Sequence, residues 1–257
     1  MLQFLLADAR PDVEVELAGA DYHYLVRVRR MNAGSALTVV DDAGTRYRAT
    51  VTRLTDRTLI LGIGPQQAAP ATGPPACRLT LIQALPKGPL MDRIVRQATE
   101  LGVAAIVPVV AARTQGRPEP TASARRQARW QRIARQAAQQ SGAVAPSIGP
   151  PLELRQYLGR RTPAPLELVF HPGAVPLQEV PVSDLPSQRT LEVRCAVGPE
   201  GGFSVSEREL FRTCGFRGVA LQAGVLRVDT AAVAALAAVG QLLATIHSGS
   251  TNVIGSS

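Results

Sequence analysis

The chain has 257 residues, of which 46% are hydrophobic and 19% charged, and its formal net charge is +8. This composition is typical of a folded globular protein and excludes a disordered chain, while the length allows one large domain or two small ones. The positive excess, almost all from arginine, favours a polyanionic partner such as RNA or DNA.

The first 70 residues have the pattern of a small β-sheet domain. Three segments are expected to form strands: ALTVV at 36–40, TRYRATVTRL at 45–54 and TLILGIG at 58–64. In the second segment, apolar Tyr47, Ala49, Val51 and Leu54 alternate loosely with polar residues, as in a strand with one buried face. Short strands separated by turn signals such as DDAG predict a small barrel.

The chain changes in character after these strands. Residues 65–76 are rich in proline, alanine and glycine without any periodicity, which is typical of a linker. From Cys77 onward, apolar runs alternate with helical patterns. The runs expected to form strands are 79–85, 104–112, 166–172, 192–197 and 218–221. This alternation predicts an α/β domain with a mostly parallel sheet.

The helical patterns of this region have recognisable ends. The segment 91–102 closes on a glycine at the expected cap position, and a second helix is expected to end at Gly142. The apolar face of the first helix is expected to consist of Ile94, Val95, Ala98 and Leu101. The alanine-rich run 231–246 is shorter than the ~20 residues of a membrane span, so we expect a buried helix and no membrane insertion.

Three widely separated cysteines, Cys77, Cys195 and Cys214, form no Cys-x-x-Cys or Cys/His cluster. We therefore expect no metal site and a reducing compartment, which indicates a cytoplasmic protein. The first residues contain no basic segment before their short apolar run, so we expect no secretory leader.

The stretch GPEGGFSVSE, residues 198–207, lies between an expected strand and an expected helix. It lacks the lysine and the spacing of a phosphate-binding loop, and its Glu200 would repel a phosphate. Ser204 and Glu207 fit a capping box, so the first amides of the helix have partners within the chain. The stretch is therefore either a tight structural turn or one wall of a site where a flat ligand lies against glycine backbone.

A second candidate feature follows some twenty residues later. Arg227 lies between Leu226 and Val228, and either Asp229 or Thr230 can cap the helix of small residues that begins there. An arginine in an apolar setting is costly unless it is paired. Arg227 therefore either forms a salt bridge with a neighbouring carboxylate or directs its charge at a substrate.

Taken together, these motifs resemble the bacterial RsmE family of 16S rRNA uridine-N3 methyltransferases, of the SPOUT class, over nearly the whole chain. The matching motifs are HYLVRVRRMNAG at 23–34, KGPLMDRIVRQATELGV at 87–103, RWQRIARQAAQQSG at 129–142, GPEGGFSVSE at 198–207 and LQAGVLRVDTAAVAAL at 221–236. The chain departs from the family pattern at Gln136, Ala143, Gln222 and Val228, and carries Asp229 where glutamate is usual. These departures concern the RNA contacts more than the site of the methyl donor.

The resemblance implies a fold and an activity. It implies a PUA-like β-barrel at 1–70, a linker at 71–76 and a SPOUT α/β domain at 77–257 whose end is tied in a trefoil knot. The implied activity is the transfer of a methyl group from S-adenosylmethionine to N3 of a uridine in the 16S rRNA of the small ribosomal subunit, by a homodimer without a metal. A methyltransferase with another RNA target and a non-catalytic RNA-binding assembly factor remain alternatives.

The resemblance also implies which residues form the site. Those expected to bind the methyl donor are Phe170, His171, Gly198, Pro199, Glu200, Gly201, Gly202, Leu221, Val225, Leu226, Arg227 and Thr230. His171 is as readily explained as a loop histidine bonded locally. The catalytic candidates are Arg227, which would stabilise the anion that develops on the uracil ring, and Glu200. The general base is left open between Glu200, Asp229 and water.

Basic residues in both halves of the chain are candidates for RNA binding. They are His23, Arg27 and Arg30 in the barrel, Lys87 at a strand end, and Arg113, Arg126 and Arg129 in an arginine-rich stretch. A solvated helix face is the alternative explanation of that stretch. No row of aromatic residues indicates single-strand stacking, so phosphate and shape contacts are expected to dominate.

Overall fold

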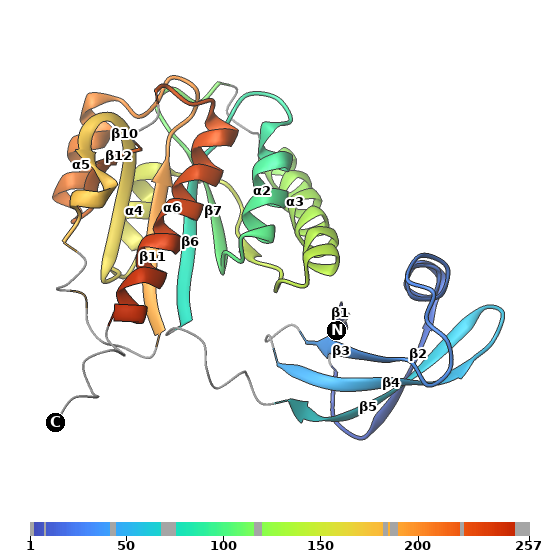
Figure 1. The fold of residues 1–257 in the computed structure, drawn as a ribbon. Helices are drawn as coiled ribbons and strands as arrows, with labels where there is room; N and C mark the ends of the chain where they lie inside the picture. The colour runs from blue at the N-terminus through green and yellow to red at the C-terminus, as the bar shows by residue number, and fades with distance from the viewer. Residues whose placement is uncertain are drawn as a thin grey trace, which may run out of the picture. The chain divides into compact units, whose positions relative to one another are not determined.

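The computed structural model describes residues 3–7, 9–41, 45–67, 76–115, 120–181, 185, 190–221 and 224–249. The chain forms two compact units (Figure 1). One comprises Met1–Thr72 with Ala138–Val144, and the other comprises Gly73–Ala137 with Ala145–Ser257. Residues 42–44 of the predicted DDAG turn and 68–75 of the predicted linker lie outside the described residues, whereas 65–67 and Ala76 belong to strands, so the linker predicted at 65–76 is wrong at both ends.

The N-terminal unit is built on a five-stranded sheet in the order β1-β3-β4-β5-β2. Its strands are β1 (Gln3–Leu5), β2 (Val13–Ala18), β3 (Ala36–Val40), β4 (Arg46–Leu54) and β5 (Thr58–Gln67). The three strands expected from the sequence are confirmed, with β5 extending further than predicted. Tyr47, Ala49 and Val51 of β4 are buried, whereas Arg48 and Arg53 are exposed. The alternation predicted for this strand is therefore correct.

The segment between β2 and β3 is helical. The prediction that the first 70 residues form only β-structure is therefore wrong at this segment. It consists of the short helix α1 (Gly19–Tyr22) and the π-helical turn η1 (His23–Val28). Tyr22 and Leu25, three residues apart, bury their side chains in the core of the sheet, a spacing that suits a helix and not a strand. The RNA-binding candidates His23, Arg27 and Arg30 are exposed on or just beyond this helical segment.

The C-terminal unit contains a seven-stranded sheet whose pairings are all parallel. Its main order is β12-β10-β11-β6-β7-β8, and β9 also pairs with β7. The strands are β6 (Ala76–Ala84), β7 (Ala105–Val110), β8 (Ser147–Ile148), β9 (Leu152–Glu153), β10 (Leu166–Pro176), β11 (Thr190–Val197) and β12 (Arg217–Ala220). The predicted α/β class with a mostly parallel sheet is confirmed.

Helices cover both faces of this sheet. They are α2 (Leu90–Glu100), α3 (Pro120–Ser141), α4 (Leu154–Arg160), α5 (Val205–Thr213) and α6 (Val228–Gly249), with a single turn η2 (Leu177–Glu179). Leu81 and Ile82, neighbours on β6, belong to opposite cores. The core on the Leu81 side includes residues of α2, α3 and α6, and the core on the Ile82 side includes residues of α4 and α5. A strand buried on both faces explains why its sequence is a continuous apolar run.

Two helix predictions were tested in detail by the structure. Ile94, Val95 and Ala98 of α2 are buried as predicted, but Leu101 is 40% exposed, so its assignment to the apolar face is wrong. Leu101 is the C-cap residue, and the chain leaves the helical path there toward Gly102, whose φ is +75°. The alanine-rich helix α6 buries one face in the core on the Leu81 side of the sheet.

No helix among the described residues is long and apolar enough to cross a membrane. The trefoil knot implied by the resemblance stays a prediction. The connections between β10, β11 and β12 and the start of α6 are the parts of the unit that position the candidate site.

Candidate active site

The predicted donor-binding residues follow three neighbouring strands of the large sheet. Strand β10 pairs with β11 on one side and with β12 on the other, and all three run parallel. Their carboxyl ends therefore meet at the same edge of the sheet (Figure 1). The tertiary structure thus places Phe170 and His171, the turn 198–202 and the loop that ends at Arg227 at one edge, where open α/β sheets bind ligands.

The glycines of the turn are required by the turn itself. A Cβ atom added at Gly198 would lie 3.0 Å from the backbone of Gly202 and of Phe203, a contact so tight that this backbone would have to shift to accept a side chain. Gly202 has a φ of +66°, a conformation that residues with side chains rarely adopt, and its amide donates to the carbonyl of Pro199 over 2.8 Å. The turn is therefore a compact element whose shape does not depend on a ligand.

Glu200 binds the backbone of the loop that follows β6. Its Oε1 accepts a hydrogen bond from the backbone N–H of Lys87 over 2.9 Å. The carboxylate is otherwise exposed to solvent, and its second oxygen forms no hydrogen bond with the residues that the structure describes. Glu200 therefore links two neighbouring loops and keeps one oxygen available to a ligand.

Glu207 makes a similar link to the loop that follows β7. The predicted capping box is confirmed, since the Ser204 hydroxyl accepts from the Glu207 amide and Glu207 Oε2 accepts from the Ser204 amide. In addition, Glu207 Oε1 accepts from the backbone N–H of Ala112 over 2.7 Å. Arg113 in the same loop donates to the carbonyl of Gly201 over 2.5 Å. The turn is thus fixed to the ends of both β6 and β7.

His171 lies in an irregular part of β10. The register against β12 shifts between Phe170 and Val175, so the residues between them bulge out of the strand. One ring nitrogen of His171, Nδ1, lies 3.0 Å from the carbonyl oxygen of Pro172, and the other, Nε2, lies against Gly218, where an added Cβ would be only 2.8 Å away. Local bonding therefore accounts for the orientation of His171.

Arg227 is exposed, so its predicted apolar setting is wrong. Its side chain is 76% exposed, and its nearest carboxylate atom, Asp229 Oδ1, is 3.8 Å away. Val228 next to it, the first residue of α6, is buried. Val225, two residues earlier, is 92% exposed. The loop before α6 therefore presents an apolar side chain and a cation to solvent together.

Asp229 belongs to the helix packing and is not freely available as a base. It is buried, and its Oδ2 accepts a hydrogen bond from Arg93 of α2 over 2.8 Å. Burial raises the pKa of its carboxyl, but the hydrogen bond from Arg93, together with backbone N–H groups and the charge of Arg227, outweighs this and holds the pKa below its ordinary value.

The predicted RNA-binding residues of this unit differ in their availability. Arg113 donates a hydrogen bond to the carbonyl of Gly201. Arg129 donates two hydrogen bonds to Asp92 Oδ2, from Nε over 2.9 Å and from Nη2 over 2.5 Å. Lys87 and Arg126 are exposed, and neither side chain has an ion pair with the described carboxylates. Across the described residues, no group of three His, Cys, Asp or Glu side chains is placed to hold a metal ion.

Gln83 is a residue at this edge that the sequence analysis did not select. It is completely buried near the end of β6, and its amide nitrogen donates to the carbonyl of Ala84 and lies 3.4 Å from that of Val197. Its Oε1 has no hydrogen-bond partner among the described residues. An amide within the apolar run LTLIQAL was the signal that could have indicated a polar role under the turn.

Comparisons with known proteins identify relatives of both units. Residues 73–240 match the family model of an RNA methyltransferase domain, and residues 17–64 match that of an RNA methyltransferase PUA domain. The chain is 34% identical over 239 residues to the ribosomal RNA small subunit methyltransferase E of Synechocystis, which covers 90% of this chain and 74% of the relative.

Two solved structures are similar over almost their whole length. One is a ribosomal RNA small subunit methyltransferase E from Neisseria gonorrhoeae bound to S-adenosyl methionine, with 28% identity, a TM-score of 0.78, and coverage of 94% of this chain and 98% of that one. The other is a putative methyltransferase from Legionella pneumophila in complex with the bound cofactor SAM, with 27% identity, a TM-score of 0.76, and coverage of 94% and 97%. With the matched PUA domain, these likenesses confirm the fold class predicted for each unit, apart from the knot.

The bonds of Glu207 give a prediction about stability. Replacing Glu207 with alanine removes half of the capping box and leaves the amides of Ser204 and Ala112 without an acceptor. We expect the free energy of unfolding, measured by urea denaturation, to fall by roughly 2–4 kcal/mol.

The matched control is Glu209→Ala, on the same helix. Glu209 is exposed and, within the described part of the chain, pairs only with exposed Arg212, so its loss is expected to leave the unfolding midpoint nearly unchanged. Equal midpoints for the two variants would contradict the role assigned to Glu207.

Proposed function

Because this chain belongs to the RNA methyltransferase family, whose domain it matches over residues 73–240, we propose that it methylates N3 of a uridine in the 16S rRNA of the small ribosomal subunit, with S-adenosylmethionine as methyl donor. The observation that carries this proposal is the similarity, over nearly the full chain, to a curated ribosomal RNA small subunit methyltransferase E. The arrangement of residues at the edge of the sheet supports it independently.

The residues at that edge suit the chemistry of S-adenosylmethionine. When bound, this donor supplies an electrophilic methyl group on a sulfonium cation, and the Glu200 carboxylate is compatible with that charge. The exposed side chain of Val225 provides an apolar surface for a flat adenine. Further residues proposed to line the donor site are Phe170, His171, Gly198, Pro199, Leu221, Leu226, Arg227 and Thr230.

The chain's own groups must also deal with the proton and the charge of the uracil. N3 of uridine carries a proton and becomes a good nucleophile only when that proton leaves, which places negative charge on the ring. Arg227 is exposed and, among the described residues, is close to only one carboxylate, so its guanidinium is available to stabilise this charge. Glu200 is a better candidate than Asp229 for the proton, because Asp229 is buried and bonded to Arg93.

The RNA substrate is proposed to contact basic residues on both units. Seven residues are proposed for this role: His23, Arg27, Arg30, Lys87, Arg113, Arg126 and Arg129. Of these, Lys87 and Arg126 are the most available in the C-terminal unit, because Arg113 and Arg129 already have partners. The active form is proposed to be a cytoplasmic homodimer.

The reaction can be tested directly on ribosomal RNA. Small ribosomal subunits and free 16S rRNA from a strain that lacks the gene would be incubated with the purified protein and S-adenosylmethionine, and modified uridines mapped. We expect one uridine to gain an N3-methyl group. Methylation of only another RNA would support the alternative of a different target, and failure to bind the donor in calorimetry would support a non-catalytic RNA-binding factor.

Arg227 is expected to act on the reaction and not on the fold. In Arg227→Ala, the rate of methyl transfer should fall by roughly 10²–10³-fold, because the developing anion loses its cation. The thermal unfolding midpoint should not change, since the side chain is largely exposed. Arg212→Ala removes the same charge from an exposed position on α5 and should retain full activity, whereas an active Arg227→Ala enzyme would contradict this role.

The two functions proposed for Glu200 can be separated by two substitutions. Glu200→Gln keeps an oxygen that can accept from the Lys87 amide, so affinity for S-adenosylmethionine should be retained, while loss of the carboxylate should lower the transfer rate by roughly 10²-fold. Glu200→Ala also releases the loop and should weaken donor binding roughly tenfold. Calorimetry and single-turnover rates measure the two effects, and identical behaviour of both variants would argue against this division.

A further inference from the structure

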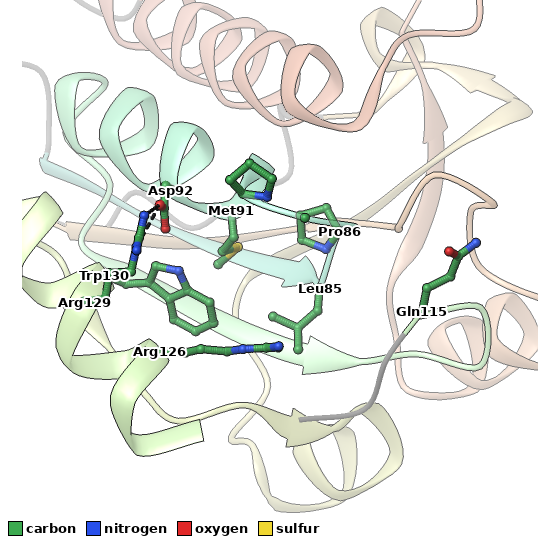
Figure 2. A pocket seen from close by; sticks show the side chains of 10 residues that line it. Leu85, Pro86, Met91, Asp92, Gln115, Arg126, Arg129 and Trp130 are labelled. Atoms are coloured by element: carbon green, nitrogen blue, oxygen red, sulfur yellow. Dashed lines mark hydrogen bonds and ion pairs between the residues drawn. The ribbon is translucent and has the colours of Figure 1, made fainter. Parts of the chain in front are cut away.

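A pocket of about 360 Å³ lies in the C-terminal unit beside the loop that follows β6 (Figure 2). It is enclosed by that loop, by the start of α2 and by the middle of α3. Its volume lies within the range of ligand sites, roughly 300–1,000 Å³. None of the residues proposed to bind the methyl donor lines it.

The inner walls of the pocket are apolar. They are formed by Leu85 and Pro86 of the loop, Met91 of α2 and Trp130 of α3, all of which are buried. Walls of this kind favour a flat, weakly polar group such as a nucleobase, which gains by leaving water. Gln115, which lies to one side of these walls (Figure 2), also belongs to the lining, and its side-chain amide carries both a donor and an acceptor.

The positive charge of Arg126 at the rim favours an anionic ligand. Arg126 lines the pocket, is exposed, and has no ion pair with a carboxylate of the described residues. The one carboxylate in the lining, Asp92, is neutralised by its two hydrogen bonds from Arg129. A guanidinium that has no ion pair among the described residues and lies next to apolar walls matches a nucleotide, with a base to bury and a phosphate to bind. The same charge disfavours a sulfonium cation, so the methyl donor is a poor occupant.

The pocket is connected to the candidate active site through its own loop. The amide of Leu85 donates to the carbonyl of Val109 over 2.9 Å, and the amide of Lys87 donates to Glu200 over 2.9 Å. The loop that forms one wall of the pocket is therefore held by the turn proposed to bind the donor. A group held in the pocket is fixed relative to that turn.

We propose that this pocket binds one unstacked nucleotide of the substrate RNA, with the base between the apolar walls and the phosphate on Arg126. The proposal rests on the proposed function, since it assigns the pocket to the RNA of that reaction. It adds a base contact to an interface for which the sequence indicated only phosphate and shape contacts. Sequence-dependent RNA recognition commonly uses single-stranded bases that are turned out of the stack.

The only tryptophan of the chain, Trp130, lines the pocket and reports on its occupant. Tryptophan fluorescence would be followed while uridine 5′-monophosphate, or a short single-stranded oligouridylate, is added to the full-length protein. We expect a saturable change with both. In Arg126→Ala the apparent affinity should fall roughly tenfold, because a charge-assisted hydrogen bond to phosphate is lost.

The matched control is Arg155→Ala, on α4. Arg155 is exposed, and its helix packs on the opposite face of the sheet from Trp130, so this variant removes the same charge without touching the pocket. It should bind the nucleotide as the unchanged protein does. Equal weakening in both variants would overturn the proposal, because it would show a non-specific effect of net charge. Circular dichroism of each variant confirms that it is folded.

Two further outcomes would overturn the assignment. The first is a Trp130 signal that does not respond to either uridine ligand, and the second is competition between S-adenosylmethionine and the nucleotide for the same signal. Calorimetry with S-adenosylmethionine keeps this test separate from that of the proposed function. If the protein binds S-adenosylmethionine but Trp130 fluorescence does not respond to the nucleotide, only the pocket assignment is wrong. If the nucleotide changes the fluorescence but S-adenosylmethionine does not bind, the proposed methyltransferase function is wrong and the nucleotide site stands.

Discussion

Two carboxylates of one strand-to-helix connection hold three loops of the C-terminal unit in place. Glu200 accepts from the backbone of the loop after β6, and Glu207 accepts from the backbone of the loop after β7 while it caps α5. Loop amides near the end of a parallel sheet lack strand partners, and a carboxylate is the strongest acceptor that a side chain can offer them. The shape of the sheet edge at the ends of β6, β7 and β11 depends on these bonds.

This fixed edge contrasts with the groups that surround it. Val225 is 92% exposed and the side chain of Arg227 is 76% exposed, whereas the turn 198–202 is internally bonded and closely packed. A rigid backbone that presents free apolar and charged side chains is the arrangement expected of a binding site. The loop after β6 extends the same support to the pocket beside Arg126 and Trp130, so donor and RNA contacts would share one scaffold.

Much of the fold could be predicted because burial requires apolar residues at regular spacings along the sequence. The alternation in β4, the continuous apolar runs of the large sheet and the capping box at Ser204 each follow from local geometry. The failures are local patterns altered by tertiary context. Leu101 has helical spacing but lies where the chain leaves the helix, and residues 19–28 form helical turns because Tyr22 and Leu25 pack into the sheet core.

The candidate site shows the limit of the sequence more sharply. The fold class, the family resemblance and the two segments that form the edge could all be predicted, because they depend on residue types and their spacing. The bond of Glu200 to the Lys87 amide, the exposure of Arg227 and the pocket bordered by Arg126 and Trp130 could not be predicted and follow from tertiary packing. Lys87 and Glu200, for example, are 113 positions apart in the sequence. Which distant residues meet, and which stay exposed, depends on how the strands and helices pack, and a local sequence pattern does not contain that information.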